Sequence, residues 1–504
     1  MAAMDPDLLT RFDTLQEKLI PLWRSIEQLN DDQQTIVVVP SIPDGLLPAS
    51  WVPPYEERYL FLLFLLRQPN ARMIYMTSQA IAPSIVDYYL DLLPGVVANH
   101  ARQRLHLVSP LDPSEASLTS KLLARPRLLE RVRALIRDPD RAHMVPFLTT
   151  EREMELAVAL GIPMYGAHPN HYVLGTKSEC RRLFREAGVP IAEGREDLRS
   201  LEEVAAALVE LRRDRPAMRR AIAKHNDGVS GLGNAQVELE GLPEPGAAGE
   251  AGEVQERVRA LRPEAEDQTV EGYEATLREQ GGIVEERIEG EEVRSPSVQM
   301  RLTPLGDLQI LSTHDQMLGG PTGQIYLGAR FPANRAYGPM IAREAEKIGR
   351  RLAAEGVVGR FAIDFIVVKN TAGEWDPYAI EINLRKGGTT HPFLTLQYLT
   401  DGKYDPVTGI FHTAIGQEKF YVATDTLKSE AYHVFTPLDL FDLVSNHRLH
   451  YNHTSQTGIV MHMISPIGTV GKVGLTAIGN SAEHAEALYQ EFILLLNEKA
   501  GMLK

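Results

Sequence analysis

The segment from Gly359 to Pro392 constrains the fold more than any other part of the chain. Phe361–Val368 alternates in side-chain type and is rich in β-branched residues, so it predicts a β-strand. Tyr378–Ile382 predicts a second strand, and Thr371–Glu374 between them contains a glycine for which a positive φ costs little. The sequence therefore predicts a β-hairpin.

A turn about Ala372-Gly373 determines which residues of this hairpin face each other. Asp364 then lies opposite Glu381. Because side chains alternate along a strand, Glu381, Asn383 and Arg385 share one face. Two carboxylates, a carboxamide and a guanidinium are expected on one side of the sheet.

This polar face predicts a metal site. Directly opposed like charges destabilise a sheet, and Mg²⁺ usually takes one or two carboxylates together with substrate phosphates. Arg385 beside the metal can bind phosphate or carboxylate oxygens in a bidentate manner. The alternative is an amphipathic hairpin with a solvated charged face. The apolar opposite face (Phe361, Ile363, Phe365) and the close backbone approach at Gly387-Gly388 favour the metal site.

The size and net charge of the chain limit the number of domains and the kinds of partner that can be expected. Its 504 residues suggest about three domains. A net charge of −15 without a basic stripe argues against a nucleic-acid-binding protein.

Cys180 is the single cysteine, so neither a disulfide framework nor a cysteine-based zinc site is expected. The N-terminus does not read as a signal peptide, and the longest apolar run, Tyr59–Leu66, is too short to span a membrane. We expect a cytoplasmic protein.

The N-terminal third predicts alternating strands and helices. An amphipathic helix is expected over Met1–Leu29 and a strongly apolar one over Glu56–Arg67. Strands are expected at Thr35–Val39, Arg72–Met76, Leu105–Val108 and His143–Leu148. This alternation indicates a doubly wound parallel sheet. A glycine-rich fingerprint does not follow the first strand, so an independent dinucleotide site is not expected there.

A glycine-rich loop, His225–Asn234, follows the predicted strand Arg220–Lys224. Its glycines leave N–H groups free of side chains, so the loop can surround phosphates. Such loops are common, and Lys224 at the end of the strand is what favours phosphate binding. A flexible acidic loop is expected at 243–252, and Ile283–Val293 predicts either a solvated edge strand or a functional acidic segment.

The C-terminal section, from about Ala431, predicts a small α+β module. Strands are expected at Tyr432–Val434, Gly458–Ser465 and Gly474–Gly479, around helices at Pro437–Asn446 and Ser481–Leu496. His447, His450 and His453 are spaced three apart, but their polar surroundings indicate a loop. Surface or substrate-contacting histidines are therefore favoured over a metal site.

The ordered set of motifs resembles the ATP-grasp carboxylate–amine ligases. In that family's order the chain has Lys177 before a helix ending in GVP, Lys224 before the glycine-rich loop, the VEERIEG segment, and Asp364 followed by Glu381-Ile-Asn383. The stretches VVVPSIPDG, YEERYLFLLFLL, GTKSECRRLFREAGVP and HVFTPLDLFDLVS extend the resemblance to peptide ligases of the pheganomycin-biosynthesis type, over nearly the whole chain.

This resemblance implies an α/β and α+β multidomain fold. A Rossmann-like pre-ATP-grasp domain would occupy residues 1–168. The ATP-grasp domain, with two α+β lobes, would occupy 169–425, and a small α+β module for substrate recognition 426–504.

The resemblance also implies roles for individual residues. Lys177 and Lys224 would contact nucleotide phosphates, and Arg385 would act with Lys224 in catalysis near the acyl phosphate. The other implied nucleotide contacts are Gly228, Ser230, Gly231 and Gly233 for the phosphates, Glu286, Arg287 and Ile288 for adenine, and Glu292 (or its neighbour Glu291) for the ribose. The implied ligands of two Mg²⁺ ions are Asp364, Glu381 and Asn383. Candidate substrate contacts, by proximity to these motifs, are His314, Gly388, Thr389 and His391, with Thr436, Asp439, His447 and His450 as a recognition surface for the acceptor.

The implied function is an ATP-dependent peptide ligase that forms an amide through an acyl phosphate and releases ADP and phosphate. Its partners would be a small-molecule carboxylate donor and an amino acid or peptide amine, in natural-product biosynthesis. Neither nucleic acid nor membrane is expected as a partner, and since ligases of this fold are often dimers, a homodimer stays open. Two alternatives remain: modification of a protein terminus or side chain, and a nucleotide-binding regulator without turnover.

Overall fold

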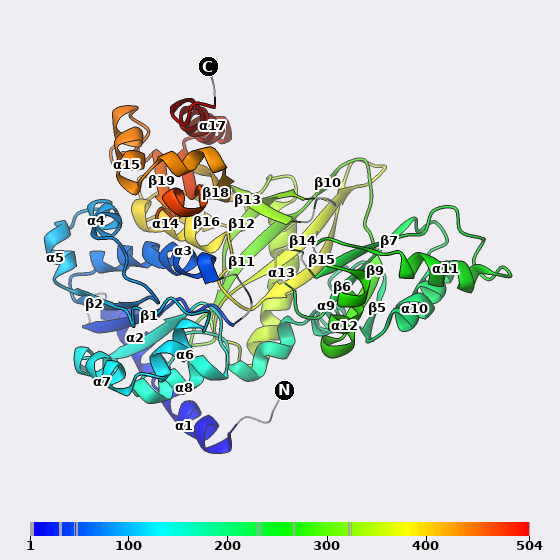
Figure 1. Ribbon diagram of the computed structural model, residues 1–504, viewed down its shortest axis with the longest axis horizontal. Helices are drawn as coiled ribbons and strands as arrows, with labels where there is room; N and C mark the ends of the chain where they lie inside the picture. Colours follow the sequence, from blue (N-terminus) through cyan, green and yellow to red (C-terminus); the bar gives the residue numbers. More distant parts are fainter. Residues whose placement is uncertain are drawn as a thin grey trace.

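The structure is a computed structural model that describes residues 5–29, 33–44, 46, 49–228, 231, 233–265, 268–320, 323 and 325–502. Three sheets of four, five and nine strands carry the fold, with helices packed against them. In Figure 1 the N-terminal region (blue to cyan) lies beside the C-terminal region (orange to red), and a small lobe (green) extends to the opposite side. Across the described residues, no helix has the length and apolar character needed to cross a membrane.

The N-terminal sheet is parallel, as the sequence predicts. Its order is β3-β2-β1-β4, and Val37 pairs with both Ile74 and Met144. The strands are β1 Gln34–Val39, β2 Ala71–Met76, β3 Leu105–Val108 and β4 Ala142–Pro146. The helical elements of this region are α1 Pro6–Gln16, α2 Leu19–Leu29, η1 Ala49–Trp51, α3 Val52–Glu57, η2 Arg58–Arg67, α4 Pro83–Asp91, α5 Ala98–Arg102, α6 Leu118–Leu123, α7 Pro126–Leu135, η3 Pro139–Arg141, α8 Glu151–Leu160 and η4 Pro169–Gly175.

Two helix predictions for this region are wrong. The expected helix over Met1–Leu29 is two helices, α1 and α2. Pro21 has no N–H with which to continue the helical hydrogen bonding from α1, so a new helix starts near it. The apolar stretch expected as one helix over Glu56–Arg67 ends its α-helical part at Glu57 and continues as the 3₁₀ helix η2. Because η2 is buried on nearly all sides, tertiary contacts rather than helix propensity determine its winding.

The small lobe is built on a five-stranded antiparallel sheet of order β5-β9-β6-β7-β8. Its elements are β5 Gly194–Leu198, α10 Leu201–Asp214, β6 Arg220–His225, β7 Asn234–Glu238, α11 Glu250–Arg259, β8 Arg262–Pro263, α12 Val270–Gln280 and β9 Gly282–Glu286. The expected strand Ile283–Val293 is split between two sheets. Its first part lies in β9, and its end lies in β10, Val293–Arg294, on the edge of the large sheet. Residues 287–292 therefore connect the two lobes.

The acidic segment 243–252 is tied to the small lobe. Arg212 Nη1 is 2.5 Å from Glu250 Oε1, and both side chains are buried. The same guanidinium donates to the carbonyl oxygen of Pro243 at 2.7 Å. One arginine on α10 thus holds both the beginning and the end of this segment.

The large sheet has nine strands in the order β10-β14-β11-β12-β13-β18-β20-β19, with β15 paired to β14. Its other strands are β11 Pro296–Leu302, β12 Leu308–Gly319, β13 Ile325–Phe331, β14 Gly359–Lys369, β15 Trp375–Asn383, β18 Phe420–Lys428, β19 Gly458–His462 and β20 Lys472–Gly479. The sequence analysis did not anticipate β13 and β18. The expected domain boundary between residues 425 and 426 lies inside β18, so the sheet runs without interruption into the C-terminal region.

The helices of this part of the chain lie around the large sheet (Figure 1). They are α9 Lys177–Glu186, α13 Gly338–Ala354, α14 Thr390–Thr400, η5 Glu430–Val434, α15 Pro437–Asn446, α16 Ile467–Val470 and α17 Ala482–Lys499, and a short hairpin of β16 Lys403–Asp405 and β17 Ile410–His412 follows α14. Helix α13 lies against β11 and β12, and α17 lies against β18 and β20. The strand expected at Tyr432–Val434 is wrong, because these residues form η5, in which Ser429 accepts a hydrogen bond from the N–H of Ala431.

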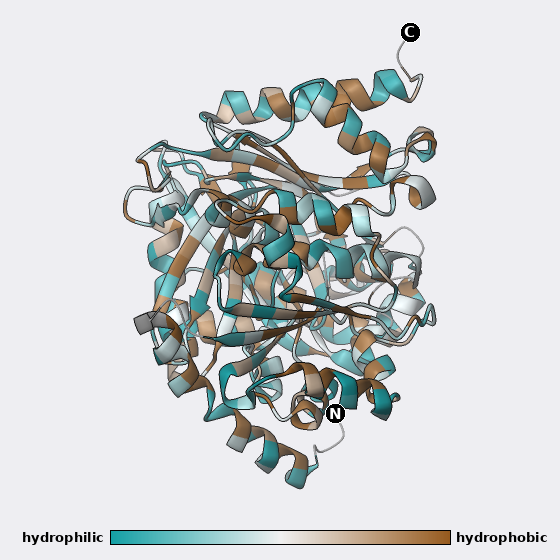
Figure 2. Ribbon diagram, turned by 90° about the vertical axis from the view of Figure 1, so that its left-hand side faces the viewer, coloured by the Kyte–Doolittle hydropathy of each residue, from teal (hydrophilic) through white to brown (hydrophobic). Residues whose placement is uncertain are grey.

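The N-terminal and C-terminal regions share one hydrophobic core, in which η2 packs against α14, β18, β19 and β20. In Figure 2 the interior strands are largely brown, whereas teal gathers along outer helices. Hydrogen bonds join the two regions as well: Tyr89 Oη donates to the Met461 carbonyl oxygen at 3.1 Å, and the N–H of Ile464 donates to Glu57 Oε1 at 2.5 Å. The C-terminal region is therefore packed into the body of the protein.

Candidate active site

The hairpin of β14 and β15 has the predicted pairing at its polar positions. Asp364 pairs with Glu381, and Ala362 pairs with Asn383. Toward the turn the register shifts by one residue, so that Phe365 pairs with Ala379. Ile380 is the extra residue of a β-bulge, and without this bulge the two carboxylates would not face each other.

Asn383 joins the two facing carboxylates. Its Nδ2 atom lies 3.1 Å from Asp364 Oδ2 and 3.0 Å from Glu381 Oε1. On the other side of the pair, Lys177 Nζ donates to Glu381 Oε2. Three polar groups of one sheet face and one lysine from α9 thus meet at a single point.

The two carboxyl groups differ in their pKa. Burial, and then the charge of Glu381, raise the pKa of Asp364 to about 7. Burial acts on Glu381 in the same direction, but the charge of Lys177 outweighs it and holds the pKa of Glu381 below its usual range. One lysine thus compensates one of the two carboxylates, and a second cation is needed to keep both ionised near neutral pH.

Helix α9 positions Lys177. Thr176 caps the helix by accepting from the N–H of Glu179, and the N–H of Ile382 on β15 donates to Cys180 Sγ at 3.2 Å. Burial raises the pKa of the Cys180 thiol to about 12, so this cysteine is a packing residue and a poor nucleophile. Helix α9 is therefore docked directly against the strand that carries Glu381.

Lys224 lies at the end of β6, as predicted, and is buried with an acidic partner that the sequence analysis missed. Its Nζ atom lies 2.6 Å from Glu285 Oε1, while Arg181 Nη1 lies 2.7 Å from Glu285 Oε2. Burial opposes ionisation of Glu285, but the charges of Lys224 and Arg181 keep its pKa below the usual value. Glu285 belongs to the VEERIEG segment and pairs with Ile222 across the sheet, a contact that depends on strand register.

The glycine-rich loop is attached to the same helix N-terminus. The N–H groups of Lys177 and Ser178 donate to the carbonyl oxygen and Oδ1 of Asn226, at 3.2 and 2.9 Å. Gly231 has φ +82°, a conformation that favours glycine. Ser230 lies outside the described residues. The loop base therefore lies beside Lys177.

One cavity of about 470 Å³ lies between the two lobes and unites most of the predicted nucleotide and metal residues. The predicted residues that line it are Lys177, Lys224, Gly228, Gly231, Gly233, Glu286, Arg287, Ile288, Asp364 and Glu381. The lining residues that were not predicted include Glu285, Arg294, Gln316, Leu318, Phe365 and Ile366. The cavity thus has a charged end at the hairpin and apolar walls.

The connection between the lobes forms one wall of this cavity. The N–H groups of Glu286 and Arg287 donate to the carbonyl oxygens of Glu193 and Arg220, at 2.8 and 3.1 Å, so these two N–H groups belong to the sheet. Glu292 is not among the residues that line the cavity, but its carboxylate is 2.8 Å from Nη2 of Arg294, which does line it. An adenine contact here would therefore use other backbone groups of this connection.

Arg385 follows β15 and lies deeper, on the side of the N-terminal region. Its guanidinium is 5.9 Å from the centre of the Phe147 ring. Burial lowers the pKa of Arg385, while the charges of Glu381 and Asp364 and the neighbouring Tyr59 act in the opposite direction. Arg385 is thus close to both hairpin carboxylates and to Tyr59 of η2.

The candidate substrate contacts are not gathered at this cavity. His314 is completely buried, and its Nε2 atom lies 2.6 Å from Tyr421 Oη, so it is a core histidine. Thr389 Oγ1 accepts from Gln299 Nε2 at 2.5 Å. A Cβ atom on Gly388 would lie 2.6 Å from the Tyr326 ring, so glycine is required for close packing there. His391 lies in a separate buried cluster with Asp425 and His462.

The C-terminal candidates are also separate from the cavity. Thr436 and Asp439 form a capping box at the start of α15, in which the Thr436 N–H donates to Asp439 Oδ2 at 2.6 Å. His447 and His450 are exposed in the region that follows this helix. Thr436 and Asp439 therefore have a structural role, which the T-x-x-D spacing could have revealed.

Sequence comparisons identify relatives of this chain. Family models described as IQCH-like, ATP-grasp; Pre ATP-grasp domain; and PGM1 C-terminal domain match residues 170–257 with 263–406, 78–162, and 439–492, respectively. The chain is 30% identical over 439 residues to the L-propargylglycine–L-glutamate ligase of Streptantibioticus cattleyicolor, an alignment that covers 85% of this chain and 86% of that protein. It is 24% identical to IQ motif-containing protein H of Danio rerio, over 75% of this chain but 39% of that protein.

Solved structures share the fold. The biotin carboxylase of Campylobacter jejuni, in complex with an ATP analogue, has a TM-score of 0.53 at 14% identity and covers 91% of this chain and 90% of its own. An N5-carboxyaminoimidazole ribonucleotide synthetase in complex with ADP has a TM-score of 0.51 at 12% identity and covers 92% of this chain and 97% of its own.

Proposed function

The chain belongs to the ATP-grasp ligases of the pheganomycin-biosynthesis type, and we propose that it joins a small-molecule carboxylate to the amine of an amino acid or peptide, with conversion of ATP to ADP and phosphate. The observation that carries this proposal is the cavity between the lobes, where Lys177, Lys224 and two facing carboxylates meet. This arrangement combines groups for phosphate with groups for a divalent cation.

ATP would occupy this cavity with its phosphates toward the hairpin. Lys177, Lys224 and the N–H groups near Gly228, Gly231 and Gly233 would contact the phosphates. The connection at Glu286, Arg287 and Ile288 would lie along adenine, and the apolar side chains of Leu318, Phe365 and Ile366 would cover its faces. Glu292, next to the lining residue Val293, would contact the ribose. Lys224 would then exchange its contact with Glu285 for a contact with phosphate, and Arg181 would keep Glu285 paired.

The donor set at the hairpin fits Mg²⁺. Asp364 and Glu381 present carboxylate oxygens and Asn383 a carboxamide, and the raised pKa of Asp364 indicates that this pair lacks one compensating positive charge. We assign these three residues to one or two Mg²⁺ ions. Bound there, the metal would neutralise charge on the transferring phosphoryl group.

The reaction follows from these groups. An oxygen of the donor carboxylate attacks the γ-phosphorus of ATP, so a carboxyl–phosphate bond forms and the bond to ADP breaks. The amine nitrogen then attacks the acyl carbon, which forms the amide and releases phosphate and one proton. Arg385, close to both carboxylates, would hold the acyl phosphate and stabilise the negative charge that develops on the acyl oxygen.

The substrate class is inferred from the family. The relative from Streptantibioticus cattleyicolor is named as a ligase of L-propargylglycine and L-glutamate. For this chain we propose an amino acid or other small carboxylic acid as the donor and an amino acid or short peptide as the acceptor. The guanidinium of Arg385, which lies near Tyr59 of η2, is suited to bind the carboxylate of such an acid.

Product analysis tests the proposal. The protein would be incubated with Mg-ATP, a pool of amino acids and other carboxylic acids, and hydroxylamine as a substitute amine. ADP that appears together with a hydroxamate supports an acyl phosphate, and fractionation of the pool then identifies the donor. AMP as the product would overturn this mechanism, and ATP binding without turnover over a broad pool would favour a regulator.

A further inference from the structure

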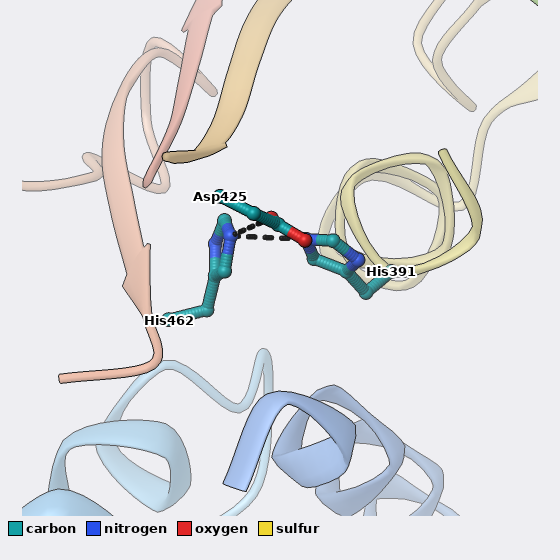
Figure 3. A group of neighbouring side chains, drawn as sticks. All are labelled: His391, Asp425 and His462. Atoms are coloured by element: carbon teal, nitrogen blue, oxygen red, sulfur yellow. Dashed lines mark hydrogen bonds and ion pairs between the residues drawn. The ribbon is translucent and has the colours of Figure 1, made fainter. Parts of the chain in front are cut away.

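A second polar cluster lies apart from the proposed ATP site, between the C-terminal strands and the N-terminal region. It consists of His391 on α14, Asp425 on β18 and His462 on β19 (Figure 3). All three residues are buried, with exposed fractions of 3%, 5% and 4%. Neither the ATP site nor the hydrophobic core accounts for three such side chains pointing at one another.

Three donor atoms of this cluster form a compact triangle. His391 Nε2 lies 3.0 Å from His462 Nε2, and Asp425 Oδ1 lies 3.1 Å from the first and 2.7 Å from the second. Metal–ligand bonds of about 2.1 Å place neighbouring donor atoms about 3.0 Å apart in an octahedral shell and about 3.4 Å apart in a tetrahedral one. The triangle, with sides of 2.7 to 3.1 Å, is therefore close in size to one face of an octahedral coordination shell.

Hydrogen bonds alone do not satisfy all three contacts when both histidines are neutral. If both Nε2 atoms carry protons, both can donate to Asp425, but the contact between the two histidines then joins two donors. If only one Nε2 atom carries a proton, this N–H can be shared between the carboxylate oxygen and the other Nε2 atom, but the lone pair of the unprotonated Nε2 atom then faces the carboxylate oxygen. One cation in front of the triangle makes all three contacts favourable at once.

The surroundings of the triangle fit a ligating carboxylate. Arg58 Nη1 lies 2.6 Å from Asp425 Oδ2, the oxygen that does not face the histidines. Hydrogen bonds of this kind orient metal-ligating carboxylates in proteins. His462 is held in place by close packing, since a Cβ atom on Gly474 would lie 2.3 Å from its ring. Asp425 and His462 are thus held in place by contacts with η2 and β20.

We propose that His391, Asp425 and His462 bind one divalent transition-metal ion, of which zinc is the simplest representative. Two imidazole nitrogens and one carboxylate select against Mg²⁺, which prefers oxygen ligands, and suit Zn²⁺, Co²⁺ or Fe²⁺. The ion would connect the start of α14 to β18 and β19. Because α14 follows directly after Arg385–Thr389, the ion would also fix the loop that carries Arg385.

Cobalt provides a direct test, because Co²⁺ bound to imidazole nitrogen absorbs visible light. The untagged full-length protein, first treated with a chelator, would be titrated with Co²⁺ in the presence of excess Mg²⁺, which occupies sites built from oxygen ligands. We expect one equivalent of Co²⁺ to bind with a visible absorption band, and one equivalent of Zn²⁺ to abolish that band. The absence of a visible band in the wild-type protein would overturn the proposal.

Two variants locate the site. His462→Ala and Asp425→Asn should each weaken Co²⁺ binding by about 100-fold or more, while the exposed His412→Ala on β17 should bind as the wild type does. Circular dichroism would show whether each variant is folded. If a variant does not fold, the melting temperature of the wild-type protein provides a second test. One equivalent of Zn²⁺ should raise this temperature, and an unchanged melting temperature would contradict the proposal. Equal Co²⁺ binding by all variants would overturn the assignment to these residues.

Discussion

Lys177 and Glu381 lie 204 residues apart in the sequence and form a direct ion pair between the first residue of α9 and strand β15. Lys177 is assigned to phosphate binding and Glu381 to metal binding, so this ion pair connects the two parts of the proposed site. Its charge balance is asymmetric, because Asp364 faces Glu381 without a lysine of its own. Substitutions at the hairpin should therefore change the binding of metal and phosphate.

Glu381→Gln should lower the rate of ADP formation by about 10³-fold, since it removes one of two carboxylates assigned to the metal and leaves Lys177 without its anionic partner. A coupled ADP assay at saturating Mg-ATP measures this effect. Asp376→Asn, on the same strand near the turn, is the matched control and should retain activity. Equal activity of Glu381→Gln and the control would contradict the proposed role.

Lys224→Met should weaken ATP binding by about 10-fold to 100-fold, the usual effect of losing a hydrogen bond to a charged group. The variant should remain folded, because Arg181 still pairs with Glu285. Titration with a fluorescent ATP analogue measures the affinity, and the exposed Lys403→Met serves as the control. Unchanged affinity in Lys224→Met would remove this lysine from the nucleotide site.

Arg212→Met should lower the free energy of unfolding of the small lobe by about 3–5 kcal/mol, because it leaves Glu250 buried without its charged partner. It also removes the hydrogen bond to the Pro243 carbonyl. Urea denaturation followed by circular dichroism gives the value, with the neighbouring exposed Arg213→Met as control. Similar stability of the two variants would show that segment 243–252 does not depend on Arg212.

Glu56 should make stability depend on pH. Burial raises its pKa from 4.5 to about 7, against hydrogen bonds from Ser78 that act in the opposite direction. The stabilising contribution is therefore fully present below about pH 4.5 and is lost as the pH rises through 7. At about 1.4 kcal/mol per pKa unit, the loss amounts to about 3 kcal/mol.

Glu56→Gln isolates this effect, because glutamine keeps an acceptor for the Ser78 N–H and does not ionise. Relative to wild type, the variant should gain stability between pH 5 and pH 8. Melting temperatures over this range measure the gain, and the exposed Glu115→Gln should not show it. A parallel pH dependence in wild type and Glu56→Gln would be the contrary result.

Much of the site could be predicted from sequence because its main determinant is local. The turn and the strand alternation can be read from residues 361–382, but the register next to the turn is one residue away from the expected one, and the pairing of Asp364 with Glu381 also requires the β-bulge at Ile380. Even here the β-bulge at Ile380 was not foreseen. Lys224 was found from its position before the glycine-rich loop, whereas Lys177 was found through family resemblance, since its role depends on contact with a distant strand.

The features that the sequence did not predict depend on contacts between residues far apart in the chain. Glu285 pairs with Lys224 through strand register, and a run of carboxylates does not reveal which one points inward. The cluster of His391, Asp425 and His462 draws on three elements separated by other secondary structure. The winding of η2 is set by burial on nearly all sides, and composition does not distinguish a 3₁₀ helix from an α-helix in such a setting.

The strand order of the large sheet has a consequence for how the protein is made. Strand β20, Lys472–Gly479, lies between β18 and β19, although it follows both in the sequence. Strand β20 must therefore be synthesised before this half of the sheet can form. Until β20 has been synthesised, the edge of β18 and the apolar surface of η2 remain uncovered in the nascent chain.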